Sequence, residues 1–232
     1  MINVALIRHS MTEGNKLKRY IGITDEPLCM EGIKLLEGRQ YPKVEAVYVS
    51  PLQRCRETAM IIYPDRPHII IEGFREIDFG EFENKNYKEL DGNPKYQEWI
   101  DSGGKLDFPG GEPQADFAER CIKSFHKMMD NACSEGYKDI AAVVHGGTIM
   151  SILNDLLKPD DYYTYMAKNG EGFLLKWEDG GQTDVSQIFF DSPSFRVPAG
   201  SAHRGSQMDV ASHKGHRSSH RFSGEDHPGR ED

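Results

Sequence analysis

Two histidines of this 232-residue chain each lie at the end of a short apolar run, within two residues of its last apolar side chain. The first run, Asn3–Ile7, leads into Arg8 and His9, and the second, Ile140–Val144, leads into His145. Such runs are typical of buried strands, and open α/β sheets bind ligands at the carboxyl ends of their strands. Neutral imidazole is a nucleophile at pH 7, and a neighbouring guanidinium offers a planar fork of donors to phosphate oxygens. The pattern suggests attack of an imidazole on phosphorus, although a histidine satisfied by hydrogen bonds is the structural alternative.

A third segment, Ser50–Thr58, offers a second arginine for the same anion. It follows an apolar run over residues 46–49 and has the pattern of a helix start. Helix N-termini attract anions, and an arginine in the first turn strengthens that attraction. Arg54 and Arg56 lie two residues apart and therefore point to different faces of a helix, so one of them is expected to be exposed.

A fourth segment, Phe74–Glu83, follows the apolar run 68–71 and combines aromatic and acidic residues. A partly desolvated carboxyl group has a raised pKa, which suits it to give and take a proton near neutral pH. Several acids compete in this segment, and composition does not choose among them. A solvated acidic loop is the alternative interpretation.

Periodicity predicts the elements that carry these four segments. Alternation of strands and helices predicts an α/β fold, a three-layer sandwich with a mostly parallel six-stranded sheet and helices on both faces. The carboxyl ends of parallel strands share one rim, so we expect the four segments to converge there. Strand-like runs lie at 2–7, 45–49, 68–71, 139–144, 172–177 and 185–190, and helical patterns lie at about 30–40, 53–62, 86–101, 113–133 and 147–157.

Composition excludes several classes of protein. The net charge of −9 disfavours a nucleic-acid binder, and no apolar run is long enough to span a membrane. The first residues enter a strand at once and do not resemble an export signal, so we expect a cytoplasmic protein. The four cysteines have no CxxC spacing, so zinc and thioredoxin motifs are absent and reduced thiols are expected. No feature of the sequence specifies an oligomeric state.

The composition changes near residue 190. Residues 191–232 contain eight Ser, five Gly and five of the nine His, and few apolar side chains. Such a segment cannot bury enough surface to offset its ordering entropy, so we expect a disordered tail after one domain of residues 1–190. A metal-binding tract in this tail is disfavoured, because the spacing of its histidines is irregular: His203, His213, His216 and His220.

The four segments together resemble the motifs of the histidine phosphatase superfamily, whose fold is called phosphoglycerate mutase-like. Arg8–Asn15 resembles R-H-G-x-T-x-x-N, and Ser50–Ala59 resembles S-P-L-x-R-x-x-x-T-A. Phe74–Asn84 resembles L-x-E-x-x-F-G-x-x-E-G, and residues 143–147 resemble V-x-H-G-G. The resemblance covers nearly all of residues 1–190, and the combination of motifs is highly specific.

This resemblance assigns roles that the residues alone leave open. It implies that His9 forms a phosphohistidine and that Glu76, rather than its acidic neighbours, donates the proton. It selects Arg54 over Arg56 and implies that the phosphoryl oxygens are held by Arg8, Asn15, Arg54 and His145. It implies hydrolysis of a small phosphomonoester, such as α-ribazole phosphate or a sugar phosphate, with no metal and no cofactor, because arginines and a charged histidine supply the positive charge.

Two positions depart from the family pattern. Ser10 replaces the usual glycine, and a serine with positive φ there would cost on the order of 1 kcal/mol. Asn84 replaces the glycine after Glu83, and asparagine tolerates the left-handed conformation well. We therefore expect both loops to keep their function.

The lid-like insertion, at about residues 83–112, bears on the choice between hydrolysis and transfer. Cofactor-dependent mutases usually carry a longer, basic insertion, whereas this one is short and acidic, so a phosphatase is favoured over a phosphoglycerate mutase-type phosphotransferase. A non-catalytic phospho-ligand binding module and a metal-dependent hydrolase are further alternatives. Four lid aromatics are candidates to line the leaving-group pocket or simply to pack the lid: Tyr87, Tyr96, Trp99 and Phe108.

Overall fold

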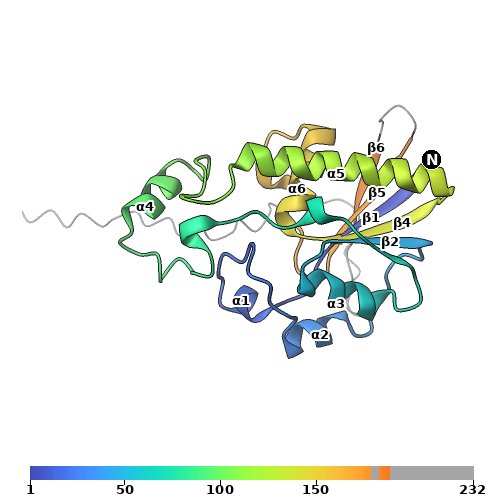
Figure 1. The fold of residues 1–232 in the computed structure, drawn as a ribbon, viewed down its shortest axis with the longest axis horizontal. Helices are drawn as coiled ribbons and strands as arrows, with labels where there is room; N and C mark the ends of the chain where they lie inside the picture. Colours follow the sequence, from blue (N-terminus) through green and yellow to red (C-terminus); the bar gives the residue numbers. More distant parts are fainter. Residues whose placement is uncertain (179–182, 189–232) are drawn as a thin grey trace, which may run out of the picture. The chain divides into compact units, whose positions relative to one another are not determined.

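The computed structural model describes residues 1–178 and 183–188, which form a six-stranded sheet of order β3-β2-β4-β1-β5-β6 (Figure 1). β1 pairs in parallel with β4, and β2 pairs in parallel with both β3 and β4. β5 and β6 run antiparallel, so the sheet is mixed and its parallel part is limited to four strands. Only a few residues join β5 to β6, whereas a parallel pair needs a crossover of about a dozen or more. The strands are β1 (Ile2–Arg8), β2 (Ala46–Val49), β3 (His68–Ile70), β4 (Asp139–Val144), β5 (Gly172–Trp177) and β6 (Thr183–Ile188).

Helices cover both faces of the sheet, as predicted. In Figure 1, α5 and α6 lie on one face, α2 and α3 lie on the other, and α4 lies beyond the strand ends. The α-helices are α1 (Glu13–Lys16), α2 (Met30–Leu36), α3 (Gln53–Ile62), α4 (Pro94–Asp101), α5 (Gln114–Glu135) and α6 (Gly146–Leu157).

Two predicted helices are longer in the sequence pattern than in the structure. The predicted helix 86–101 is wrong in its first half, because only α4 forms. Gly92 has a left-handed φ of +75°, and Pro94, which has no N–H, occupies the first turn. The side chain of Asn93 caps α4 by accepting from the N–H of Lys95 at 3.0 Å. The predicted helix 30–40 ends at Leu36, just before a left-handed Gly38.

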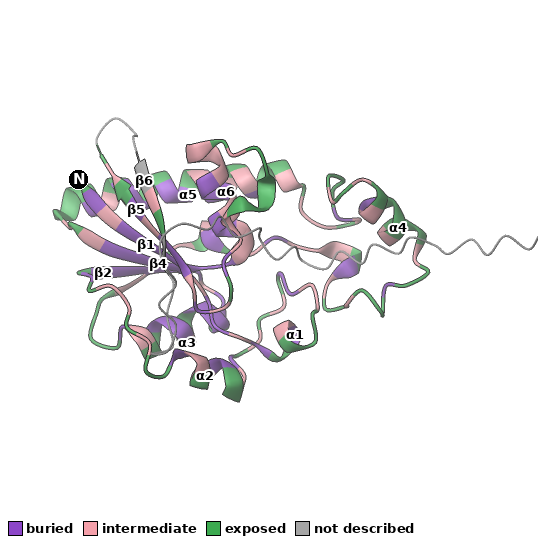
Figure 2. Ribbon diagram, turned by 180° about the vertical axis from the view of Figure 1, so that it is seen from behind, coloured by how far each residue is buried: buried purple, intermediate pink, exposed green. Residues whose placement is uncertain are grey.

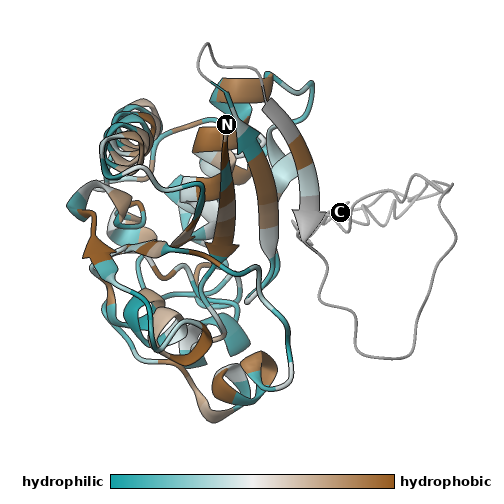
Figure 3. Cartoon of the chain, turned by 90° about the vertical axis from the view of Figure 1, so that its right-hand side faces the viewer, coloured by the Kyte–Doolittle hydropathy of each residue, from teal (hydrophilic) through white to brown (hydrophobic). Residues whose placement is uncertain are grey.

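The central strands bury both of their faces, which explains why they read as continuous apolar runs rather than as alternating ones. Val4 and Leu6 pack in a cluster with side chains of α5 and α6, whereas Ala5 and Ile7 pack in a cluster with side chains of α3. Figure 2 shows these strands as buried, and Figure 3 shows their apolar colouring. This two-sided packing fixes the carboxyl end of β1, from which His9 follows.

The lid segment, residues 83–112, has its own small aromatic core. Trp99 and Phe108 are each only 8% exposed and pack with Phe82 and with Phe117 of α5. Tyr96 stacks on Trp99 and is partly buried. Packing of the lid therefore accounts for three of the four predicted aromatics, and Tyr87 is 42% exposed.

Some predictions concern residues that the structure does not describe. The predicted tail, residues 191–232, and its histidines lie outside the described residues. Within residues 1–178 and 183–188, no helix is long and apolar enough to cross a membrane. In that same part of the chain, no three or more His, Cys, Asp or Glu side chains are grouped so that they could hold a metal ion.

Candidate active site

His9 lies just beyond the end of β1 and is held by its backbone and by its ring. Its N–H donates to the Val144 carbonyl oxygen of β4 at 2.9 Å, and the side chain is 4% exposed. The ring Nδ1 lies 2.7 Å from the carbonyl oxygen of Ser10. A carbonyl can only accept, so Nδ1 carries the hydrogen and Nε2 keeps its lone pair. The tautomer held by Ser10 is thus the one that leaves Nε2 able to attack an electrophile.

The two departures from the family pattern behave differently. Ser10 is absent from the described non-glycine residues that have positive φ, so the condition under which a serine would be strained is not met there. Its N–H donates to Thr58 Oγ1 at 3.0 Å and its hydroxyl donates to the Gly32 carbonyl at 2.6 Å, so the serine adds a tether to α2. Asn84 does adopt the left-handed conformation, with φ +56°, as an asparagine in place of glycine was expected to tolerate.

The structure brings the second strand-end histidine beside the first, because β1 and β4 are neighbours in the sheet (Figure 1). His145 precedes α6, and its ring centroid lies 5.2 Å from that of His9 in an edge arrangement. Its Nε2 lies 2.8 Å from Ser50 Oγ and 3.5 Å from Cys55 Sγ. Residues 136 positions apart in sequence therefore converge at one rim, as predicted.

The surroundings of both imidazoles favour the neutral form. Burial lowers the pKa of His9 and of His145 well below the usual value, and the positive charges of Arg54 and Arg8 lower both further. The family resemblance implies a charged His145, whereas the surrounding residues by themselves oppose its protonation. A phosphoryl dianion between the two arginines would offset their field and favour protonation of His145.

Two guanidinium groups lie near this histidine pair, the fully buried one of Arg54 and the partly buried one of Arg8. Arg8 donates from Nη1 to the Ala167 carbonyl at 2.8 Å, and Arg54 donates from its two Nη atoms to the carbonyls of Thr24 and Gly22, each at 2.8 Å. The buried Nε of each arginine has no hydrogen-bond partner among the described residues. Uncompensated buried charge is costly, so an anion at this site would be strongly favoured.

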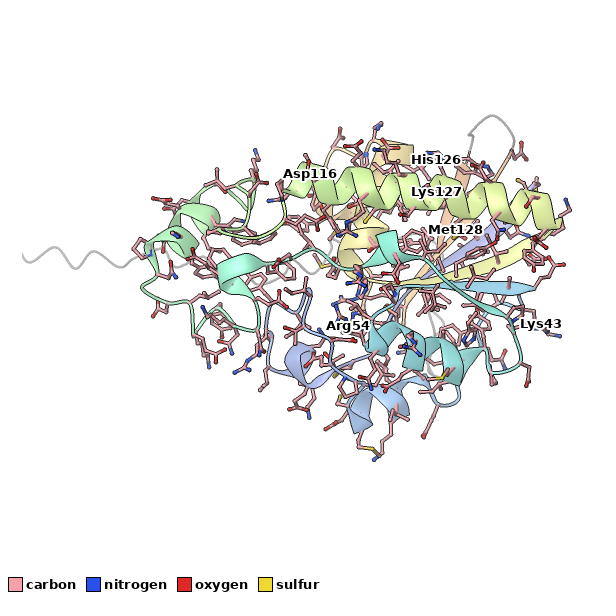
Figure 4. The ribbon with its side chains drawn as sticks, in the orientation of Figure 1. Lys43, Arg54, Asp116, His126, Lys127 and Met128 are labelled. Carbon is pink, nitrogen blue, oxygen red and sulfur yellow. The ribbon has the colours of Figure 1, made fainter. Side chains whose placement is uncertain are left out.

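Arg54 lies at the start of α3, as Figure 4 shows. It is fully buried, whereas Arg56 is exposed. The prediction that the two arginines point to different faces is confirmed, and the one turned inward is the one that the resemblance selected.

Glu76 brings a carboxyl group to the N-terminus of α6. Its Oε1 accepts from the N–H of Ile77 at 3.1 Å and its Oε2 lies 3.4 Å from the N–H of Gly147. Burial raises the pKa of Glu76, although the Ile77 N–H and the charges of Arg54 and Arg8 partly oppose this rise. A methyl group at position 147 would lie only 2.6 Å from Oε1, so the glycine makes room for this carboxyl group.

The other acids near Glu76 in the chain have structural partners instead. Glu72 pairs with Arg75 at 2.7 Å, and Asp78 accepts from the N–H of Gly80 at 2.8 Å. Glu81 pairs with Lys95 at 2.6 Å, and Glu83 accepts from the N–H groups of Gly22 and Thr24, each at 2.9 Å. Glu83 thereby holds the loop whose carbonyls bind Arg54.

Asn15 is tied to a segment that sequence reasoning missed. Its Oδ1 accepts from Nδ2 of Asn169 at 3.1 Å and from the N–H of Thr12 at 3.3 Å, which leaves its own Nδ2 able to donate. Asn169 also donates to the His9 carbonyl at 3.1 Å, and Ala167 binds Arg8. An Asn-Gly pair at 169–170 indicates a turn, but no motif places this turn beside His9.

Known proteins resemble this chain in sequence and in fold. The sequence profile of the histidine phosphatase superfamily (branch 1) matches residues 4–187. Phosphoserine phosphatase 1 of Hydrogenobacter thermophilus is 31% identical over 135 residues, which are 54% of this chain and 63% of that protein. 2,3-Bisphosphoglycerate-dependent phosphoglycerate mutase 2 of Gloeobacter violaceus is 28% identical over 171 residues, which are 67% of this chain and 76% of that protein.

The crystal structure of the α-ribazole phosphatase from Shigella flexneri matches the fold with a TM-score of 0.69 at 21% identity, covering 85% of this chain and 100% of that one. The predicted family resemblance is confirmed.

Proposed function

Because the chain belongs to the histidine phosphatase superfamily, we propose that it hydrolyses small phosphomonoesters through a phosphohistidine at His9. The observation that carries this proposal is the pairing of His9 and His145, whose ring centroids are 5.2 Å apart. Around this pair, two buried arginine Nε atoms lack a partner among the described residues. Such a site is built for an anion that reacts with an imidazole.

In this mechanism the Nε2 lone pair of His9 attacks phosphorus in line with the leaving oxygen. The P–O bond to the leaving group breaks as the N–P bond forms, and Glu76 gives its proton to the leaving alkoxide. Glu76 then takes a proton from water, whose oxygen attacks phosphorus and releases His9. Four side chains hold the phosphoryl oxygens: Arg8, Asn15, Arg54 and His145. The guanidinium charges stabilise the charge that builds on these oxygens, so the mechanism uses no metal and no cofactor.

Residues 1–190 form the catalytic domain in this proposal, residues 83–112 form its lid, and residues 191–232 are an appended tail. The substrate class is a small metabolite with an alkyl leaving group. A relative and a fold neighbour suggest phosphoserine and α-ribazole phosphate as the first compounds to test, and sugar phosphates, which the family resemblance implies, complete the panel. The similarity to a phosphoglycerate mutase keeps phosphoryl transfer as the second candidate.

The proposal is tested with p-nitrophenyl phosphate and the full chain, in EDTA, at pH 5–8. We expect turnover, a trapped acid-labile phosphoenzyme, and loss of both in His9→Ala. His126→Ala, at an exposed position of α5, is the matched control and should keep full activity. Activity that persists in His9→Ala, or that EDTA abolishes, would contradict the mechanism. Faster transfer to 3-phosphoglycerate than to water would favour the mutase alternative.

A further inference from the structure

We propose that Arg120 of α5 is a positioning residue that holds Glu76 in place for protonation of the leaving group. This inference rests on the proposed function, because it assumes that Glu76 is the proton donor. Arg120 does not touch the phosphate site. It acts on the backbone around Glu76, and its contribution is therefore expected only in the proton-transfer step.

Glu76 needs such support because its backbone belongs to no regular element. It lies between two 3-10 turns, η1 (Glu72–Phe74) and η2 (Gly80–Phe82). Two carbonyls of the segment just before it, those of Gly73 and Arg75, both accept hydrogen bonds from Nη1 of Arg120, at 2.9 and 2.8 Å. One guanidinium nitrogen thus holds the backbone that leads directly into Glu76.

The rest of the Arg120 guanidinium is fixed by Glu112, at the turn that ends the lid segment. Nε and Nη2 of Arg120 donate to the two oxygens of Glu112 at 2.9 and 2.6 Å, and the side chains are only 27% and 22% exposed. The N–H of Glu112 also donates to the Asp78 carbonyl at 3.0 Å. A planar fork can serve a carboxylate and two carbonyls at once, which a lysine ammonium cannot do with the same geometry.

Arg120 also contacts Phe117, whose ring lies close to the carboxyl group of Glu76. The guanidinium lies 5.0 Å from the centroid of the Phe117 ring. That ring would be 3.1 Å from a methyl group at position 147, and the Gly147 N–H faces Glu76 Oε2 at 3.4 Å. Arg120 therefore fixes both the backbone that carries Glu76 and the packing beside its carboxyl oxygen.

The expected consequence depends on the leaving group. A general acid matters when the leaving oxygen is strongly basic and matters little when it leaves unaided as a stable phenolate. We therefore expect Arg120→Met to lower kcat/KM for phenyl phosphate by about 30-fold or more, and to change kcat/KM for 2,4-dinitrophenyl phosphate by less than about 3-fold. The slope of log kcat/KM against leaving-group pKa should steepen.

Three further variants sharpen the test. Glu112→Gln weakens the hydrogen bonds that hold the Arg120 guanidinium, with little change of shape. It should steepen the slope less than Arg120→Met does. Arg75→Met removes an exposed arginine whose side chain pairs with Glu72 and should leave the slope unchanged. In a Glu76→Gln background, Arg120→Met should have no further effect on the slope, because it acts through that carboxyl group.

An equal loss on all aryl phosphates in both Arg120→Met and Glu112→Gln would overturn the inference, because it would indicate general damage to the fold. Additive effects of Arg120→Met and Glu76→Gln would overturn it as well. If Glu76→Gln itself leaves the slope unchanged, the proton-donor assignment in the proposed function fails, and the inference fails with it. If only Glu76→Gln changes the slope, the proposed function stands and the inference alone fails.

Discussion

The two buried imidazoles should make the stability of the protein fall steeply below neutral pH. An unfolded histidine binds a proton with a pKa of about 6.5, whereas burial and the two arginines hold the pKa of His9 and His145 well below the usual value. Below pH 6.5 the unfolded chain therefore binds more protons than the folded one, so stability present above that pH is lost as the pH falls.

The magnitude follows from the two groups. If each imidazole stays neutral in the folded protein down to pH 5.5, each costs about 1.4 kcal/mol of stability between pH 7.5 and 5.5, and both together cost about 2.7 kcal/mol. Glu76 acts in the opposite direction, because burial raises its pKa and the folded carboxyl takes up a proton as the pH falls. Comparison of variants isolates each histidine from this opposing effect.

The assay is urea unfolding of the wild-type protein and of His145→Asn at several pH values in phosphate-free buffer. His145→Asn should reduce the loss of stability between pH 7.5 and 5.5 by about 1.4 kcal/mol, which corresponds to about 3–6 °C in Tm. His126→Asn is the control, because water reaches this exposed side chain in the folded and unfolded chain alike. Parallel pH curves for the wild type and His145→Asn would refute the argument that His145 is buried and neutral.

Two further outcomes follow from the contacts of the site. Gly147→Ala would place a methyl group 2.6 Å from Glu76 Oε1. We therefore expect kcat/KM for phenyl phosphate to fall by roughly 10-fold or more, whereas kcat/KM for 2,4-dinitrophenyl phosphate is unchanged. Unchanged kinetics with both substrates would show that the carboxyl group lies elsewhere. Glu83→Gln replaces a carboxylate that accepts hydrogen bonds from the N–H groups of Gly22, Thr24 and Phe79. Calorimetry should therefore show that the free energy of unfolding falls by about 2 kcal/mol, or that Tm falls by about 4–8 °C. A Tm within about 1 °C of the wild type, on the order of the measurement error, would contradict this role.

The strand-end residues were predictable because their placement depends on local patterns. A continuous apolar run predicts a strand buried on both faces, and whatever follows the run must lie at the rim of the sheet. Arg8, His9 and His145 were located by this rule, which needs no knowledge of tertiary contacts. The choice of Glu76 among its acidic neighbours needed the family resemblance, because only the folded chain shows that those neighbours have other partners.

The features that sequence missed depend on contacts between distant segments. Asn169 meets Asn15 across 154 residues, and Arg120 reaches Gly73 across 47, so neither contact leaves a periodic pattern in the chain. The tautomer of His9 is likewise set by the carbonyl of the next residue, whose direction only the folded loop determines. The local sequence pattern thus locates the groups that react, whereas the protonation and orientation of these groups depend on buried backbone carbonyls. It follows that a variant can keep all six predicted site residues and still lose the reaction, if the contacts that orient them are broken.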